Sequence, residues 1–262
     1  MVTALTIAGS DSGGGAGIQA DLKTFAAHQV YGTSAIAALT AQNTQAVLGV
    51  HAVPAEFVVA QIDAVASDIE IHAAKTGMLA TADVVEAVAA ALARWAYPHV
   101  VVDPVMVAKS GDQLLADSAV ASVRRSLVPR ASVITPNRME AEVLLGRSVR
   151  TREDARDAAR RLVDLGAGAA ILKGGHFDDA EVIDLLFDGA AFFEFRHPRL
   201  QTRHTHGTGC TFAASLAAHL ALGHGLPAAV QHTTDYVAGA IAHGLAIGKG
   251  HGPLDHFWRG RL

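Results

Sequence analysis

Short apolar runs alternate along this chain with stretches in which apolar residues recur at every third or fourth position. The runs at 3–8 and 99–102 end at glycine or at a polar residue, as buried strands do. Helical spacing occurs between the runs, as in Ile18, Leu22 and Phe25. Because parallel strands need helical crossovers, this alternation predicts an α/β fold with helices on both faces of a mostly parallel sheet.

The same pattern predicts the individual elements. Strands are expected at 3–8, 31–40, 47–53, 69–75, 99–102, 132–135 and 169–173, with a hairpin of 182–187 and 191–195 across Asp188-Gly189. Helices are expected at 18–26, 54–65, 81–92, 114–127, 139–145, 151–165, 208–222 and 227–245. Thr81 is placed to cap the third of these helices.

The composition fits a single domain that spans residues 1–262. Half of the residues are hydrophobic, which is enough for a large core. The net charge is −4 without a lysine or arginine cluster, which argues against nucleic acid or anionic membrane as a partner. The single cysteine suits a reducing compartment, and we find no signal-peptide pattern or membrane-spanning apolar run. We therefore expect a cytoplasmic globular protein.

Polar, glycine and proline residues follow the predicted strands where each strand ends. Ligands of parallel α/β folds bind beyond the carboxyl ends of the strands. We therefore expect these segments to form one shared site. They are Gly9-Ser10-Asp11, Gln42-Asn43, Lys75-Thr76-Gly77-Met78, Asp103-Pro104-Val105-Met106, Thr135-Pro136-Asn137 and Lys173-Gly174-Gly175.

A second glycine turn, Gly207-Thr208-Gly209, leads through Cys210 into an apolar helix. The first N–H groups of a helix lack partners within it, and the helix dipole adds positive charge there, so such a turn holds anions. A thiol at the same place is expected to have a lowered pKa. An anion cradle beside an activated side chain suggests phosphoryl transfer.

Two other readings of the turns stay open. Gly15 to Ala20 fits the dinucleotide pattern G-x-G-x-x-[GA], but no acid follows at the distance a ribose needs, and the lysine of a P-loop is absent. That turn is otherwise a close backbone approach to a ligand, or only structural. His204, His206 and Cys210 suggest zinc, although their spacing matches no usual zinc pattern.

Asp103 and Glu140 are candidates for holding Mg²⁺ through water, because Mg²⁺ uses few carboxylates and keeps several waters. Alternatively, Asp103 caps a helix and Glu140 lies on a solvated helix face. The segment around Lys109 is either a mobile lid with a phosphate-binding lysine or an ordinary exposed loop.

Several motifs occur together along nearly the whole chain. They are Thr6-Ile7-Ala8-Gly9-Ser10-Asp11, Gly14 to Lys23, Thr40-Ala41-Gln42-Asn43-Thr44, Lys75-Thr76-Gly77-Met78-Leu79, Val102 to Met106, Ile134 to Asn137 with Glu140, Leu172 to His176, His206 to Cys210 and Gly248 to Pro253. In these motifs the chain resembles the bacterial hydroxymethylpyrimidine/phosphomethylpyrimidine kinases of thiamine biosynthesis, within the ribokinase-like superfamily. The superfamily usually has aspartate as catalytic base where Cys210 stands. Cysteine there resembles this branch and a similar group of pyridoxal kinases.

The resemblance implies a three-layer α/β/α fold, a homodimer, ATP as co-substrate and Mg²⁺, and it admits a monovalent cation. It implies a pyrimidine pocket of Gly9, Asp21, Gln42, Met78 and Val105, although helical spacing alone places Asp21 on a solvent face. It implies that Asp103 and Glu140 hold Mg²⁺. It implies that the nucleotide is bound by Lys173, Asn137, Thr208 and Gly209, and that the catalytic turn consists of Gly207, Thr208, Gly209 and Cys210. A pyridoxal kinase and a non-catalytic pyrimidine-binding protein are the alternatives.

Overall fold

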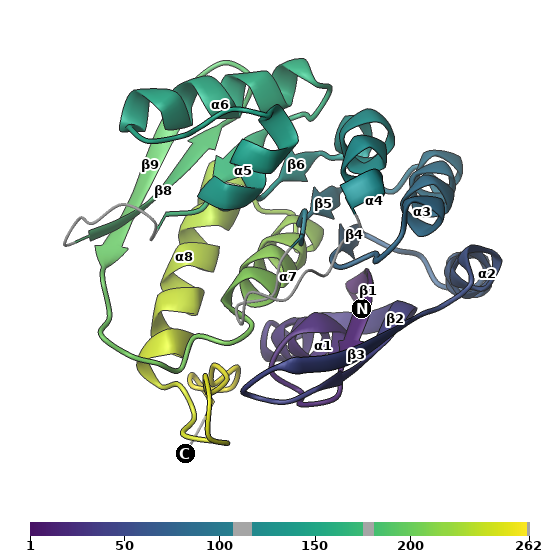
Figure 1. Cartoon of the computed structure of the whole chain (residues 1–262), viewed down its shortest axis with the longest axis horizontal. Coiled ribbons are helices and arrows are strands. Elements are labelled where there is room, and N and C mark those ends of the chain that lie inside the picture. The colour runs from purple at the N-terminus through teal and green to yellow at the C-terminus, as the bar shows by residue number, and fades with distance from the viewer. Residues whose placement is uncertain (107–116, 175–180, 261–262) are drawn as a thin grey trace.

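A computed structural model describes residues 1–106, 117–174 and 181–260, and its centre is a nine-stranded sheet (Figure 1). The strand order is β3-β2-β1-β4-β5-β6-β7-β8-β9. Pairing is parallel from β2 through β7, and antiparallel at β3, β8 and β9. The strands are β1 (Thr3–Asp11), β2 (Tyr31–Gln42), β3 (Val47–Ala52), β4 (Ala73–Thr76), β5 (Val100–Val102), β6 (Val133–Ile134), β7 (Ala170–Leu172), β8 (Glu181–Phe187) and β9 (Phe192–Pro198).

Helices cover both faces of the sheet, so the predicted three-layer fold is confirmed. Helices α1 (Gly17–Ala27), α7 (Thr208–Ala221) and α8 (Leu226–Ala242) lie on one face (Figure 1). The other face carries α2 (Ala55–Ala66), α3 (Ala82–Trp95), α4 (Asp117–Ser122), α5 (Arg138–Leu145) and α6 (Arg152–Asp164). None of the described helices is long and apolar enough to cross a membrane.

The alternation of side chains along each strand divides the core between the two faces. Val100 and Val102 of β5 pack with the α2–α6 layer, whereas Val101 between them packs with α7 and α8. Leu5 and Ala4 of β1 divide in the same way. Strands buried on both sides therefore read as continuous apolar runs, which is why the sequence pattern identified them.

Side chains cap three of the described helices, and one of these caps, Thr81, was predicted. Thr81 accepts a hydrogen bond from the backbone N–H of Val84, as expected for the cap of α3. Asn137 and Glu140 form a capping box at the start of α5, in which each side chain accepts from the other residue's backbone N–H. The cap fixes α5 directly after β6, at the carboxyl edge of the sheet.

Two predicted elements differ from the structure. The strand expected at 69–75 begins only at Ala73, because Ile69 still bonds back to Val65 at the end of α2 and packs on the core without strand pairing. The helix expected at 114–127 changes to a π-helical turn at Val123–Leu127. The segment around Lys109 lies outside the described residues.

Candidate active site

A cleft of about 850 Å³ opens over the carboxyl ends of the parallel strands. Its wall combines the strand ends with the first turn of α7, although these segments are far apart in the sequence. Every predicted site residue except Asp21 lines the cleft: Gly9, Gln42, Met78, Asp103, Val105, Asn137, Glu140, Lys173, Gly207, Thr208, Gly209 and Cys210. The roles implied for these residues remain predictions, but their convergence on one site is observed.

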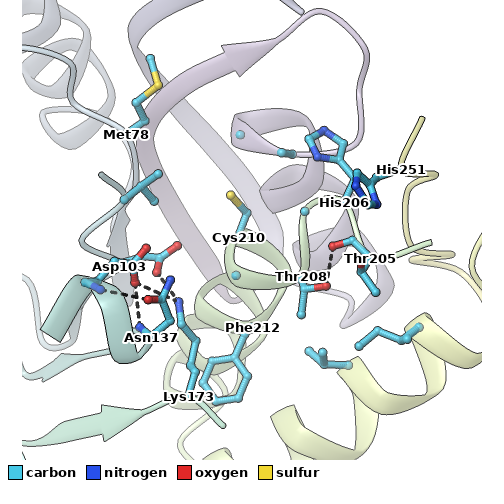
Figure 2. Close-up of a pocket in the computed structure, with 18 of the residues that line it drawn as sticks. Met78, Asp103, Asn137, Lys173, Thr205, His206, Thr208, Cys210, Phe212 and His251 are labelled. Carbon is cyan, nitrogen blue, oxygen red and sulfur yellow. Dashed lines mark hydrogen bonds and ion pairs between the residues drawn. The ribbon is translucent and has the colours of Figure 1, made fainter. Parts of the chain in front are cut away.

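The second glycine turn forms the N-terminus of α7, as its sequence predicts. Gly207 is the N-cap with φ +85°, a left-handed conformation, and a Cβ there would collide with the carbonyl oxygen of Gly15. The hydroxyl of Thr208 donates to the carbonyl oxygen of Thr205 at 2.7 Å (Figure 2). The two glycine turns therefore pack on each other, and the first N–H groups of α7 face the cleft.

Cys210 lies between two helix N-termini, because the thiol also accepts a hydrogen bond from the backbone N–H of Gly17, the first residue of α1. The prediction of a lowered thiol pKa is nevertheless wrong. Removal from bulk water raises the pKa of Cys210 to about 11, and the carboxylates of Asp21 and Asp103 act in the same direction. The charge of Lys75 and the Gly17 hydrogen bond oppose this rise without overcoming it. The thiol is neutral in the unliganded protein near pH 7.

Lys173 and Asp103 form an ion pair at the cleft wall, with Nζ 2.8 Å from a carboxylate oxygen (Figure 2). Asp103 follows β5 directly and Lys173 follows β7, so the sheet itself brings them together. Burial opposes the charge of Lys173, but Asp103 and Glu140 outweigh it and raise the pKa of the ammonium. Lys173 is therefore a fixed cation that faces the cleft.

Glu140 is buried rather than solvated, so the solvent-face reading is wrong. One of its carboxylate oxygens accepts the Asn137 N–H at 2.7 Å and lies 3.8 Å from Lys173 Nζ. Burial raises the pKa of Glu140 to about 7, with Asp103 acting in the same direction and Lys173 against it. A bound cation would stabilise the ionised form of a carboxyl group in this environment. Asp103 is followed by a non-helical segment through Met106, so it is not a helix cap.

The donor set can be tested for a metal. In residues 1–106, 117–174 and 181–260, no three histidine, cysteine or acidic side chains converge as ligands, which argues against the zinc reading of His204, His206 and Cys210. Asp103 and Glu140 supply two carboxylates on either side of Lys173. Few carboxylates and room for water suit Mg²⁺.

Asp21 differs from both expectations. Its carboxylate has no solvent exposure, so the solvent-face prediction is wrong, and it is not among the residues that line the cleft. Instead it accepts from Lys75 Nζ at 2.8 and 3.0 Å and from the Thr6 hydroxyl at 2.6 Å. Lys75, and not Asp21, is the member of this ion pair that lines the cleft.

Two side chains, Asp11 and Lys75, belong to the segments that the sequence placed in the site, but the sequence assigned neither of them a role. Asp11 accepts the N–H groups of Gly13, Gly15 and Ala16, and its other contact is His206 Nε2 at 2.9 Å. It therefore fixes the first glycine turn against the second. Aspartate two residues before a glycine is a known turn signal. Lys75 was likewise given no role, and its position at the end of a strand was the only signal in the sequence that it contributes to the site.

One end of the cleft has an apolar wall with a single amide. Met78 is buried with Ala38 and Ala80, and Val105 packs on them. A Cβ at Gly9 would lie 3.2 Å from the Met78 methyl group, so glycine leaves room for that side chain. Gln42 also lines the cleft, with its side-chain nitrogen 3.4 Å from His206 Nε2. A flat ring with polar edge atoms fits such a surface.

The fold and the cleft together define a kinase of the ribokinase-like class, with a glycine turn feeding a helix beside a lysine–aspartate pair. A model of the phosphomethylpyrimidine kinase family matches residues 11–255. The chain belongs to that family.

Individual relatives agree with this assignment. A hydroxymethylpyrimidine/phosphomethylpyrimidine kinase of Bacillus subtilis is 51% identical over 255 residues, which is 97% of this chain and 94% of the relative. A solved phosphomethylpyrimidine kinase of Clostridium difficile has a TM-score of 0.83 and 38% identity over 92% of this chain and 100% of that one. A pyridoxal kinase of Staphylococcus aureus in complex with AMP-PCP and pyridoxal has a TM-score of 0.92 and 35% identity, covering 100% and 96%.

Proposed function

We propose that the protein transfers the γ-phosphoryl group of ATP to the hydroxymethyl group of 4-amino-5-hydroxymethyl-2-methylpyrimidine, and then to the resulting monophosphate. The observation that carries this proposal is the placement of Cys210 at the N-terminus of α7, in one cleft with the Lys173–Asp103 pair. The names of the relatives support the substrate. The product of both steps is the diphosphate used in thiamine biosynthesis.

The ring is placed at the apolar end of the cleft. Met78 and Val105 pack against its faces, and the Gln42 amide, with both a donor and an acceptor, pairs with the aminopyrimidine edge. Gly9 leaves room for the Met78 side chain, which packs beside the ring. The hydroxymethyl group then points toward Cys210, between the two glycine turns.

The phosphates are placed at the other wall. The N–H groups of Thr208, Gly209 and Cys210 stabilise the negative charge that develops on the transferring group. Lys173 adds a fixed positive charge, and Gly209 permits its approach because a Cβ there would lie 3.3 Å from Nζ. Asn137 lies beside them at the start of α5. Phosphoryl transfer depends mainly on such positioning and charge stabilisation.

Asp103 and Glu140 would hold Mg²⁺ through water, which would neutralise charge on the phosphate oxygens. Glu140 gains most from the cation, because its carboxyl group has a pKa of about 7 in the protein alone.

Cys210 first loses its thiol proton to solvent, and the resulting thiolate accepts the proton of the hydroxymethyl group in the first transfer. The acceptor of the second transfer is a phosphate oxygen that is already ionised near neutral pH. That step therefore needs no base, and Cys210 matters less for it.

A pyridoxal kinase is the second candidate function, favoured by the full-length match to the S. aureus enzyme. A steady-state assay with ATP compares kcat/KM for the pyrimidine and for pyridoxal, with monophosphate and diphosphate products resolved. The assay is run with and without K⁺, since the resemblance admits a monovalent cation. We expect the pyrimidine to be preferred at least about tenfold. Preference for pyridoxal would support a pyridoxal kinase instead. Absence of ATP turnover would support a non-catalytic pyrimidine-binding protein.

The proposed enzyme is a cytoplasmic homodimer. Light scattering during size exclusion is expected to give twice the chain mass of 27.1 kDa. A mass of one chain would contradict the dimer without affecting the proposed reaction.

A further inference from the structure

A second lysine–aspartate pair lies directly beneath the floor of the cleft. Lys75 of β4 and Asp21 of α1 have no solvent exposure, and Nζ lies 2.8 and 3.0 Å from the two carboxylate oxygens. The Thr6 hydroxyl donates to one of these oxygens at 2.6 Å. Burial of two charges costs free energy even when they are paired, so apolar residues of similar volume would stabilise the fold at least as well. Stability alone therefore does not explain the pair.

The fold makes room for the ammonium group of Lys75. A Cβ at Gly77 would lie 2.8 Å from Nζ and 3.0 Å from the Cβ of Ala8. Any larger residue at position 77 would displace Lys75 or β1. Lys75 lines the cleft, whereas Asp21 lies behind it, so the positive member of the pair is the one nearer to bound substrate.

Cys210 is the group that these charges act on. Lys75 and Cys210 line the same cleft, and α7, which carries Cys210, packs on β4, which carries Lys75. Among the charges around the thiol, Lys75 has the largest effect, and it favours the thiolate. Asp21 and Asp103 favour the neutral thiol. The thiol thus responds to a balance in which Lys75 supplies the main positive contribution and Asp21 holds the lysine in place.

We infer that Lys75 is a positioning residue for the first phosphoryl transfer, in which its charge, fixed by Asp21, stabilises the Cys210 thiolate that takes the hydroxymethyl proton. The inference rests on the proposed function. In the step, the substrate O–H bond breaks and an S–H bond forms. The substrate oxygen bonds to the γ-phosphorus of ATP, and ADP leaves with the electrons of the broken P–O bond. Cys210 then returns its proton to solvent.

The account predicts opposite effects for the two members of the pair. Lys75→Met removes the charge that favours the thiolate, and Asp21, whose pKa burial raises, takes up a proton in its place. Asp21→Asn removes a charge that opposes the thiolate, while Asp103 and the thiolate itself still favour the charged form of Lys75 against its burial. A purely structural role would loosen the site in both variants and change access to the thiol in the same direction.

Iodoacetamide alkylation of the full unliganded chain tests this directly, because Cys210 is the only cysteine. Rates are measured from pH 7 to 11. At pH 9 we expect about tenfold slower alkylation in Lys75→Met and about tenfold faster alkylation in Asp21→Asn, which is one unit of thiol pKa in each direction. Arg124→Met, which removes an exposed positive charge from the opposite face of the sheet, is the control and should match the unaltered protein.

The double variant Lys75→Met/Asp21→Asn guards against misfolding, because it leaves no unpaired charge. It should be alkylated more slowly than the unaltered protein, since the effect of Lys75 on the thiol exceeds that of Asp21. Equal rates in all variants, or single variants that shift in the same direction, would overturn the inference. Neither result depends on kinase activity, so failure of the proposed reaction would be seen separately.

Discussion

Two lysine–aspartate pairs contribute to the cleft that holds Cys210, and they have the same closest distance of 2.8 Å, but they differ in what they leave free. In the Lys75–Asp21 pair both side chains are fully enclosed and both carboxylate oxygens are occupied. In the Lys173–Asp103 pair the lysine is 13% exposed, and the described contacts of Asp103 fall on one oxygen. The Lys173–Asp103 pair (the open pair) can bind ligand, whereas the Lys75–Asp21 pair (the enclosed pair) can act on the site only through its electric field. Equal distances therefore do not imply equal roles.

The largest effect is expected from breaking the open pair. Lys173→Met removes the cation that faces the transferring phosphate, so both phosphorylations should slow by about 10²–10³-fold. Rates of monophosphate and diphosphate formation, measured separately, check this. Arg124→Met, at an exposed position on the opposite face of the sheet, is the control and should leave both rates unchanged. A Lys173→Met enzyme with normal rates would remove this pair from the chemistry.

The next effect concerns the thiol that shares the cleft with the two pairs. Cys210→Ala should slow the first transfer by about 10²-fold, because general-base catalysis contributes on this scale. The second transfer should change far less, since its acceptor oxygen is already ionised. Equal losses in the two steps, each started from its own purified acceptor, would exclude the base role.

A smaller effect is expected where the open pair meets Glu140. Glu140→Gln should raise the Mg²⁺ concentration needed for half-maximal rate by about tenfold, as for removal of a group that supports a metal site. The KM for the pyrimidine should not change, because Glu140 lies at the other wall. The measurement is a Mg²⁺ titration at saturating pyrimidine. Glu142→Gln, on the same helix, is the control, and an unchanged Mg²⁺ requirement would exclude the assignment.

A last effect concerns stability rather than rate, and it comes from a buried base without an acidic partner. His219 is 7% exposed, neither ring nitrogen has a hydrogen-bond partner among the described residues, and His28, His224, His232 and Arg259 surround it. Burial lowers the pKa of His219 from 6.5 to about 3, and repulsion from positive charge on the neighbouring histidines and Arg259 acts in the same direction. The unfolded chain thus binds more protons below pH 6.5, so stability present above that pH is lost as the pH falls.

His219→Leu should flatten this loss by at most about 1.4 kcal/mol per pH unit between pH 6.5 and 4. Urea unfolding at several pH values measures the slope. The exposed His51 provides the control, as His51→Gln should retain the full slope. An unchanged slope in His219→Leu would show that acid sensitivity arises elsewhere.

The sequence allowed most of the fold to be predicted, because parallel strands buried on both faces leave continuous apolar runs. It also identified the cleft, since the strand ends meet at one edge. Ile69 was misassigned because a residue can pack on the core without strand pairing. Such packing has the same local pattern as a strand, so only the tertiary structure distinguishes them.

The electrostatics of the site could not be predicted in this way. Helical spacing placed Asp21 in solvent, because its partner Lys75 is distant in the sequence and belongs to another element. The local rule for a thiol at a helix N-terminus gave the wrong sign for Cys210, because burial and two distant carboxylates outweigh the local effect. Long-range charge contacts leave no periodic signal in the chain.

The different roles of the two lysine–aspartate pairs are tested most directly by single-turnover kinetics of both phosphorylations in Lys75→Met and Lys173→Met. Rapid quench measures the first transfer with the pyrimidine and the second with its purified monophosphate, at saturating ATP. The account predicts that Lys173→Met slows both transfers to a similar extent, whereas Lys75→Met slows only the first. Equal slowing of both transfers in Lys75→Met would contradict it.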